Sequence, residues 1–543
     1  MITGAEAMRL CLEAEGVTKI FGYPGAAIHH FYEELSNSST IEHILVRQEQ
    51  NAGHMASGYA RTTGKVGVCL ATSGPGAANL FTAIATAYMD SIPIVAITGQ
   101  VNSTLLGRDV FQEIDTTGAV SPFIKHSYLI KDAHDIPRVF KEAFHIARTG
   151  RPGPVLIDVP VNIQKQMIPF SYPETVSLRG YKPTTEGNAK QIKKVAEIMR
   201  EAERPLFCLG GGIFSAGARN QVIQLCEDSG IPAVTTLMGV GALPTDHPLN
   251  LGMIGSHGHK TANKALAETD LLIIIGARVG DRAFNTLGKA DRKSRTVHID
   301  IDPAEIGKNL STTIPLVGDI RLVLEKLLEE KPAADCGEWT DQMSAEAIKE
   351  KKKQAAPKDG SIVPKRFMNE LGNHLERDAV VVADVGQNQI WAAKYIHLTD
   401  NRFLTSGGLG TMGYSLPAAI GVKMGNPKLQ TVVVCGDGSF QMMFNELSTM
   451  VANGLDVKII LLNNRVLGMV HELQRIECYK NYCVALPAIP DFQLLAKAFG
   501  IESNCILGDE EMGPAIERML SHPGPYLLEC IVAPEESTKK IQW

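Results

Sequence analysis

The stretch Thr431–Asn464 reads TVVVCGDGSFQMMFNELSTMVANGLDVKIILLNN. Its apolar, β-branched run Thr431–Cys435 ends in a Gly-Asp-Gly turn, and a second run, Val457–Leu462, ends in Asn463 and Asn464. Continuous apolar runs that end in such turns are typical of strands in a parallel sheet covered on both faces. Ligands of these sheets bind beyond the carboxyl ends of the strands. The stretch therefore predicts both a fold class and the place of a site.

The same pattern recurs along the chain, which predicts an α/β protein of three doubly wound parallel-sheet domains. Two polar segments without clear periodicity, 165–188 and 331–363, are expected to be linkers, and the second contains a charged run, 349–354, expected to be a solvated helix or tether. The predicted domains are 1–164, 190–330 and 362–543. Further apolar runs followed by glycine turns are Val66–Ala71, Ile92–Thr98, Leu206–Leu209, Leu271–Ile275 and Val380–Val382.

Composition excludes several classes of function. The 543 residues carry a net charge of −6, so the basic surplus of a nucleic-acid-binding protein is lacking. The sequence contains no run of about 18 apolar residues, so no membrane span is predicted. The first residues resemble an amphipathic helix and not a signal peptide, so we expect a cytoplasmic location. The ten cysteines form no CxxC pair, which favours reduced thiols.

The Gly-Asp-Gly turn and the asparagine pair together predict a site for a diphosphate and Mg²⁺. Gly436 and Gly438 let backbone N–H groups approach phosphate oxygens. Mg²⁺ prefers oxygen ligands in octahedral geometry. Asp437, the side-chain carbonyl of Asn464 and a backbone carbonyl near Val466 would supply them. A Gly-Asp-Gly turn alone is often an ordinary turn; the asparagine at a second strand end favours the site.

The segment 436–470 resembles the acetolactate synthase family of thiamine-diphosphate enzymes. Two upstream segments, 385–388 and 406–413, resemble loops of that family around the same cofactor. The first has Asn388 where the family often has histidine, and in the second the family would assign Met412 to supporting the bent cofactor. The cofactor-binding residues implied in this block are Gly386, Gln387, Asn388, Gly410, Met412, Gly436, Gly438, Ser439 and Met469.

The first block carries the residues that the resemblance makes catalytic. RQEQNAG at 47–53 places Glu49 where the family has its catalytic glutamate. A glutamate at the start of a helix is more often only a favourable contact with the helix dipole, but the motif favours catalysis. Gly25 lies in a loop that resembles a family loop near the substrate, with Ala26 in place of a second glycine. Gln112 and Lys125 are implied on the substrate side.

The middle block resembles the family's FAD-binding domain, although the usual long adenine-dinucleotide fingerprint is absent. The resemblance implies Gly211, Gly212, Asp300 and Asp319 as FAD-binding residues. It also implies that Arg282 holds the carboxylate of a second keto acid, a task suited to a bidentate guanidinium. An interdomain or surface salt bridge is the alternative for Arg282.

The resemblance implies a transferase that decarboxylates pyruvate and joins the hydroxyethyl unit to a second 2-keto acid, forming 2-acetolactate as in branched-chain amino acid biosynthesis. Homodimers or homotetramers and a regulatory small subunit are implied as well. Leu473 stands where the family has tryptophan, and its neighbours His471 and Glu472 are unusual polar residues beside the acceptor pocket. The alternatives are a 2-keto acid decarboxylase or oxidase of the same family, and a non-catalytic binding homologue.

Overall fold

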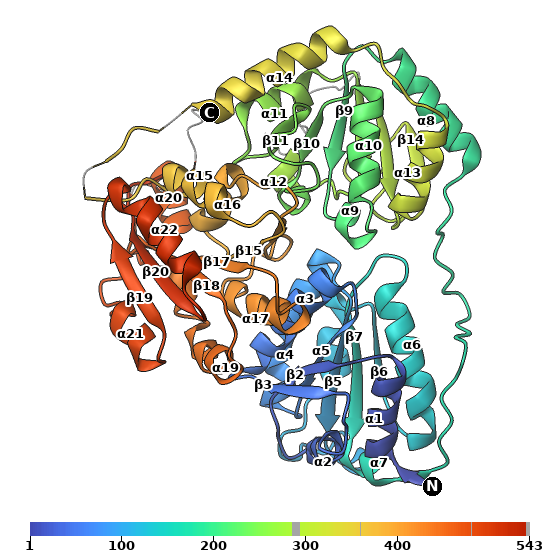
Figure 1. Cartoon of the computed structure of the whole chain (residues 1–543). Coiled ribbons are helices and arrows are strands. Elements are labelled where there is room, and N and C mark those ends of the chain that lie inside the picture. Colours follow the sequence, from blue (N-terminus) through green and yellow to red (C-terminus); the bar gives the residue numbers. More distant parts are fainter. Residues whose placement is uncertain (285–293, 354, 359, 479, 539–543) are drawn as a thin grey trace.

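The computed structural model describes residues 1–284, 294–353, 355–358, 360–478 and 480–538, and it has three α/β domains (Figure 1). Each domain contains a six-stranded sheet in which all strand pairs are parallel, flanked by helices. The predicted fold class is confirmed. The last five residues of the predicted third domain lie outside the described part of the chain.

The N-terminal sheet has the order β3-β2-β4-β5-β7-β6. Its strands are β2 (Lys19–Gly22), β3 (Glu42–Leu45), β4 (Gly67–Ala71), β5 (Ile94–Gln100), β6 (His126–Leu129) and β7 (Val155–Pro160). Its helices are α1 (Gly4–Ala14), α2 (His29–Leu35), α3 (Glu49–Thr63), α4 (Pro75–Asp90), α5 (Thr116–Val120), α6 (Ile136–Arg148) and α7 (Val161–Lys165).

The central sheet has the order β11-β10-β9-β12-β13-β14. Its strands are β9 (Pro205–Leu209), β10 (Ala233–Thr235), β11 (Asn250–Met253), β12 (Leu271–Ile275), β13 (Arg295–Asp300) and β14 (Ile314–Val317). Its helices are α8 (Ala189–Glu201), α9 (Gly212–Ser215), α10 (Arg219–Ser229), α11 (Lys260–Glu268), α12 (Asp281–Phe284), α13 (Ile320–Glu329) and α14 (Gly337–Lys352).

The C-terminal sheet has the order β16-β15-β17-β18-β20-β19. Its strands are β15 (Val380–Ala383), β16 (Arg402–Leu404), β17 (Thr431–Gly436), β18 (Lys458–Asn463), β19 (Glu502–Ile506) and β20 (Tyr526–Ile531). Its helices are α15 (Pro364–His374), α16 (Gln387–Tyr395), α17 (Ser415–Gly425), α18 (Asp437–Phe440), α19 (Leu447–Ala452), α20 (Gly468–Glu477), α21 (Phe492–Ala498) and α22 (Met512–Ser521).

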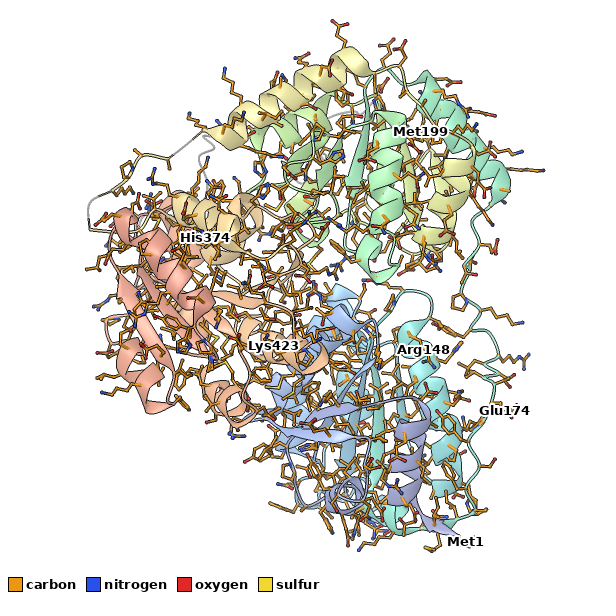
Figure 2. All side chains as sticks on the ribbon, viewed as in Figure 1. Met1, Arg148, Glu174, Met199, His374 and Lys423 are labelled. Carbon is orange, nitrogen blue, oxygen red and sulfur yellow. The ribbon has the colours of Figure 1, made fainter. Side chains whose placement is uncertain are left out.

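The central strands of these sheets are buried along their whole length, as the continuous apolar runs require. Every residue of β4 (GVCLA) and of β12 (LLIII) is buried, since helices cover both faces. The covering helices bury one face, as α8 does with Val195 and Met199. Figure 2 shows the side chains that fill the space between these layers, with Met199 on α8 and Lys423 on α17.

In each sheet the chain first adds strands on one side and then returns to the other side of the first strand. The reversal falls between β2 and β4, between β9 and β12, and between β15 and β17. Ligands of doubly wound sheets bind at this topological switch point. The glycine-rich turns selected from the sequence follow these strands, so the topology places each pair of turns beside a switch point.

The N- and C-terminal domains meet where α3 crosses α17 (Figure 1). A Cβ on Gly58 would lie 1.9 Å from the carbonyl oxygen of Ala418, and one on Gly421 would lie 1.9 Å from that of Met55. Glycine at both positions lets the two helix backbones touch. The contact joins the helix that begins at Glu49 to the helix that follows the predicted Met412 loop.

Two boundaries differ from the sequence expectation. A two-stranded sheet of β1 (Ile2–Thr3) and β8 (Met167–Ile168) extends the N-terminal domain slightly beyond residue 164. The segment 331–363 is not simply a linker, because α14 buries Trp339 and Met343 against β9, β11 and β12 in the central core. In its charged end, Lys351 donates to the carbonyls of Thr245 and Asn250, and Glu350 accepts from the N–H groups of Lys260 and Thr261 at the start of α11. No helix in the described part of the chain is long and apolar enough to cross a membrane.

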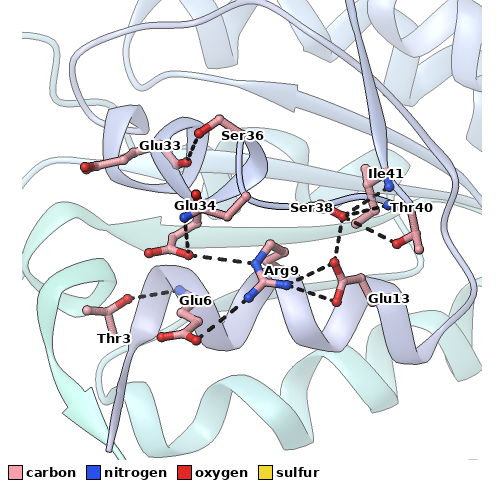
Figure 3. A network of polar contacts seen from close by, with 11 residues as sticks. Thr3, Glu6, Arg9, Glu13, Glu33, Glu34, Ser36, Ser38, Thr40 and Ile41 are labelled. Carbon is pink, nitrogen blue, oxygen red and sulfur yellow. Dashed lines mark hydrogen bonds and ion pairs between the residues drawn. The ribbon is translucent and has the colours of Figure 1, made fainter.

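A polar network joins α1 to α2 on the outer side of the N-terminal domain (Figure 3). Arg9 donates to both carboxylate oxygens of Glu13 at 3.0 Å and lies 3.8 Å from Glu34. Ser38 donates to Glu13 at 2.6 Å. These contacts fix the outer helices, and the predicted site residues take no part in them.

Candidate active site

Three turns meet at the carboxyl edge of the C-terminal sheet, after the adjacent strands β15, β17 and β18. Asp437 is buried after β17, and its carboxylate accepts hydrogen bonds from the backbone N–H of Gly438 (3.0 Å) and of Arg465 (2.8 Å). The second bond ties the Gly-Asp-Gly turn to the turn after β18. Burial raises the pKa of Asp437 to about 6.

Asn464 lies beside Asp437 on the next strand end, as the sequence predicts. Its Nδ2 donates to Gln387 Oε1 at 3.3 Å, and its Oδ1 accepts from Val466 N–H at 3.2 Å. The asparagine thus directs an oxygen toward the turn that carries Val466. The donor set of one carboxylate, one amide oxygen and a nearby backbone carbonyl is of the kind that Mg²⁺ binds.

Side chains pack closely against two glycines of these turns. A Cβ on Gly438 would lie 2.8 Å from Leu467, and one on Gly386, whose φ is 144°, would lie 2.6 Å from Asn388 Oδ1. Asn388 Nδ2 donates to the carbonyls of Asp384 and Val434 at 2.7 and 3.1 Å. Its amide hydrogens therefore link β15 to β17. The hydroxyl of Ser439 donates to Gly436 O at 3.1 Å and closes the turn.

The loop 406–413 lies beside the Gly-Asp-Gly turn. The Met412 Cε atom lies 3.9 Å from where a Cβ on Gly438 would be, and Gly410 has a positive φ of 75° on the exposed part of the loop. Met469 lies in the first turn of α20, partly buried. The structure therefore brings Met412 to the Gly-Asp-Gly turn, whereas Gly410 lies on the exposed part of its loop and Met469 on α20.

In the N-terminal domain the predicted residues meet around the turn 72–76, between β4 and α4. A Cβ on Gly25 would lie 2.4 Å from Thr72, and one on Gly74 would lie 3.0 Å from Gln112 Cα. Gln112 has a positive φ of 59°, a strained conformation for a residue with a side chain. Glu49 begins α3, and its Oε2 accepts from Asn79 Nδ2 at 2.9 Å. Its Oε1 would lie 3.3 Å from a Cβ on Gly76.

Lys125 is not brought to this group. It precedes β6, at the amino edge of the sheet, whereas Glu49 and Gln112 lie at the carboxyl edge. Its ammonium group donates to the carbonyls of Ile146 and Thr149 and to Tyr181 Oη. Burial and the nearby Arg151 lower the pKa of Lys125 to about 8. The structure therefore does not bring Lys125 to the group around Glu49, and three acceptors already receive its ammonium hydrogens.

The central domain places Gly211 and Gly212 at its switch point. Gly212 N–H donates to Gly276 O at 3.0 Å, and a Cβ on Gly210 would lie 2.1 Å from the same oxygen. The glycines therefore serve the contact between the turns after β9 and β12. Asp300 is buried at the end of β13, and burial raises its pKa to about 6. Asp319 accepts from Leu322 N–H at 3.2 Å and caps α13.

Arg282 lies in α12, after β12. Its side chain is 79% exposed, and its Nε lies 3.7 Å from Asp281. The carbonyl of Arg282 accepts a hydrogen bond from Ser256 N–H at 3.1 Å, so the backbone is anchored while the guanidinium is extended. An extended guanidinium is available for a carboxylate ligand, whereas a buried salt bridge would have occupied it.

Two carboxylates that the sequence analysis did not select, the buried Asp384 and the partly buried Asp90, hold the Met412 loop. Asp384 accepts from the N–H groups of Gly413 and Ser415 at 2.9 and 2.8 Å. Asp90, on α4, accepts from Gly408 N–H at 2.7 Å. Asp384 directly follows an apolar strand, as Asp437 does. This shared position is the feature of the sequence from which Asp384 could have been predicted. The loop is thus held from both domains.

Three family models match successive parts of the chain. The N-terminal TPP-binding domain of thiamine pyrophosphate enzymes matches residues 2–119, their central domain matches 192–327, and their C-terminal TPP-binding domain matches 384–530. Fold and site thus define a thiamine-pyrophosphate-dependent enzyme.

Curated relatives make the assignment narrower. The probable acetolactate synthase large subunit of Methanocaldococcus jannaschii is 44% identical, over 99% of this chain and 93% of its own. The acetolactate synthase of Arthrospira platensis is 43% identical over 98% and 95%, and the large subunit of Corynebacterium glutamicum is 41% identical over 98% and 87%. The chain belongs to the acetolactate synthase large-subunit family, as the resemblance in its motifs indicated.

Proposed function

We propose that this chain decarboxylates pyruvate and joins the remaining two-carbon unit to a second 2-keto acid, so that two pyruvates give 2-acetolactate and CO₂. The observation that carries the proposal is the meeting of Asp437, Asn464 and Gln387 on three adjacent strand ends, in a chain related over its whole length to acetolactate synthases. The decarboxylase, oxidase and non-catalytic alternatives are not favoured.

The residues of the C-terminal domain fit a diphosphate held through Mg²⁺. Asp437, Asn464 and the carbonyl of Val466 would hold the metal, because all three present oxygen atoms at adjoining turns. The glycine turns 386 and 436–438 leave room for phosphate oxygens beside backbone N–H groups. Thiamine diphosphate, when bound, supplies the nucleophilic carbon and the electron sink for loss of CO₂.

Glu49 exchanges the proton that this chemistry needs. Asn79 orients the carboxylate through Oε2, which leaves Oε1 to hold or release a proton. Gln112, held in a strained backbone against Gly74, positions the substrate beside Glu49. Arg282 binds the carboxylate of the second keto acid with its extended guanidinium.

We also propose that the protein binds FAD and forms a homodimer or homotetramer. FAD would lie at the central switch point, with Asp300 near its ribose and the turn at Gly211 near its phosphates; flavin absorbance of the purified protein tests this. A homodimer or homotetramer would combine Glu49 of one subunit with Asp437 of another. Mixing inactive Glu49→Ala and Asp437→Ala proteins tests that: recovered activity supports a shared site, and none contradicts it.

A regulatory small subunit is a further part of the proposal, because the relatives are named large subunits. Co-purification with a tagged copy of this chain would test it. We also propose a cytoplasmic location, which cell fractionation tests.

The first experiment incubates the purified protein with thiamine diphosphate, Mg²⁺ and pyruvate and quantifies products by NMR. One acetolactate per two pyruvates supports the proposal. Acetaldehyde or acetate in its place would move the function to a decarboxylase or oxidase. Adding 2-ketobutyrate to wild type and Leu473→Trp then tests acceptor choice; one apolar contact changes such a preference by about 10–200-fold.

A further inference from the structure

Helix α20 buries a single residue, and that residue is an acid. Glu472 is 4% exposed, whereas Val470 and Ile476 on the same helix are 44% and 47% exposed. A buried carboxylate is costly unless hydrogen bonds compensate for the lost water. Its burial therefore calls for partners.

The partners of Glu472 come from two places. Thr538 N–H and Gln387 Nε2 each donate to Oε2 at 3.0 Å, and Ser537 donates to Oε1 at 2.7 Å. The Thr538 hydroxyl also contacts Glu472, and it lies 2.9 Å from His257 Nδ1 of the central domain. Burial raises the pKa of Glu472, but these hydrogen bonds lower it overall, so the carboxyl is ionised near neutral pH.

An ionised carboxylate accepts hydrogen bonds and cannot donate them, so it fixes how Gln387 is turned. Gln387 Nε2 donates to Glu472 and to the carbonyl of Glu536, at 3.0 and 2.8 Å. Both amide hydrogens are thereby used on one side, and Oε1 faces the other side, toward Asn464. There it accepts the hydrogen bond from Asn464 Nδ2 at 3.3 Å.

The orientation of Gln387 in turn decides which atom Asn464 directs at the metal site. With Nδ2 bound to Gln387, Oδ1 faces the turn that carries Val466, and Asp437 is bonded to the same turn through the Arg465 N–H. If Gln387 turned over, its Nε2 would face Nδ2, and Asn464 would turn its own NH₂ group toward the cation. A metal binds the amide oxygen and not the NH₂ group.

We propose that Glu472, together with the segment 536–538, is a positioning residue for the metal site: it acts through Gln387 to keep the Asn464 oxygen directed at Mg²⁺. The inference rests on the proposed function, since it needs the metal at Asp437 and Asn464. It gives a role to the divergent stretch that follows Met469 and to the C-terminal segment, which crosses from β20 to the central domain. Groups that orient metal ligands typically affect affinity by about 10–100-fold.

The test is Glu472→Gln, with Glu477→Gln as the matched control. Glu477 is an exposed acid on the same helix, so its substitution removes the same charge and leaves the network intact. An amide at 472 can donate as well as accept, so Gln387 is no longer held in one orientation. The measurement is Mg²⁺ titrated into protein saturated with thiamine diphosphate, followed by calorimetry and by tryptophan fluorescence.

We expect Glu472→Gln to weaken Mg²⁺ binding about tenfold or more, with kcat largely restored at saturating Mg²⁺. Glu477→Gln should match wild type. Thr538→Val, which keeps the N–H donor but loses the hydroxyl, should give a smaller shift, and Thr538→Ser should give none. If Glu472→Gln does not fold, the two Thr538 variants decide the question. Equal Mg²⁺ affinity in Glu472→Gln and Glu477→Gln, or in Thr538→Val and Thr538→Ser, would overturn the inference. Failure of the wild type to form acetolactate would instead overturn the proposed function.

Discussion

Replacing Gly58 by alanine would place a Cβ 1.9 Å from the Ala418 carbonyl oxygen, where α3 crosses α17. Real Cβ atoms essentially never come closer than 3.0 Å to such an atom, so the two helices would have to separate by about 1.1 Å. A backbone carbonyl cannot rotate out of the way as a side chain can. The strain therefore falls on the contact between the N- and C-terminal domains.

Overpacking of this kind costs about 1–3 kcal/mol, and alanine in a helix returns about 1 kcal/mol relative to glycine. We expect a net loss of up to about 2 kcal/mol. For a unit of 150–250 residues this lowers Tm by about 2–4 °C per kcal/mol. Because α3 begins at Glu49, a shift of about 1 Å should also reduce turnover by about 100-fold.

The assay compares Gly58→Ala with Gly513→Ala by thermal unfolding and by CO₂ release. Gly513 lies in α22, where a Cβ would meet only Glu370 Oε1 at 3.6 Å, an ordinary contact. The control should be as stable as wild type or slightly more stable. If Gly58→Ala matches the control in both Tm and turnover, the close crossing of α3 and α17 is not the reason for glycine, and the reasoning is refuted.

Three further predictions concern the site and its supports. Glu49→Gln should keep the Tm of wild type and lower kcat/KM for pyruvate by about 10²–10⁴-fold, measured by CO₂ release; a rate near wild type would remove Glu49 from the chemistry. Asp437→Ala should abolish Mg²⁺ binding in calorimetry. It should also lower the free energy of unfolding by about 1–3 kcal/mol for each of the Arg465 and Gly438 N–H groups, because both lose their acceptor. Unchanged Mg²⁺ affinity would mean that the metal binds elsewhere. Asp158 accepts from Thr98 and Gln100 in the N-terminal core, and burial raises its pKa from 3.8 to about 7. The folded state then holds the proton more tightly than the unfolded chain does. The resulting stabilisation of the folded state, at most about 4 kcal/mol, is complete below about pH 4 and is lost as the pH rises through 7. Asp158→Asn should lack this pH dependence, and parallel curves of Tm against pH for the two proteins would contradict the prediction.

Much of the site could be predicted from the chain because its residues belong to short motifs at strand ends. The turns at 386 and 436–438, and the asparagine at 464, follow apolar runs, and parallel strands bring such ends to one edge. Met412 and Glu49 were selected through their motifs. Each of these predictions depends on the local sequence alone.

The structure departs from the expectations where a motif had no local physical reason behind it. Lys125 was chosen from a resemblance alone, and it lies at the opposite edge of its sheet because it precedes a strand instead of following one. The glycines of the turn 210–212 were selected for FAD from the resemblance, and the structure shows that Gly210 and Gly212 also lie against Gly276, a contact that the sequence did not reveal. The segment 331–363 was expected to be a linker because its charged run, 349–354, dominates it, whereas the apolar side of α14 fills the central core.

The sequence by itself determined the α/β class, the three sheets and the residue types at the strand ends, because apolar runs, glycine turns and oxygen ligands are local properties. Only the tertiary structure decided which strand ends are neighbours, since strand order depends on contacts between residues far apart in the chain. It therefore decided that each pair of turns flanks a switch point. It also decided that Asp384 and Asp90 bind one loop from two domains, and that Glu472 is linked to Asn464 by hydrogen bonds through Gln387. A hydrogen bond between residues tens or hundreds of positions apart leaves no periodic trace in the sequence, because its energy depends on distance in space alone.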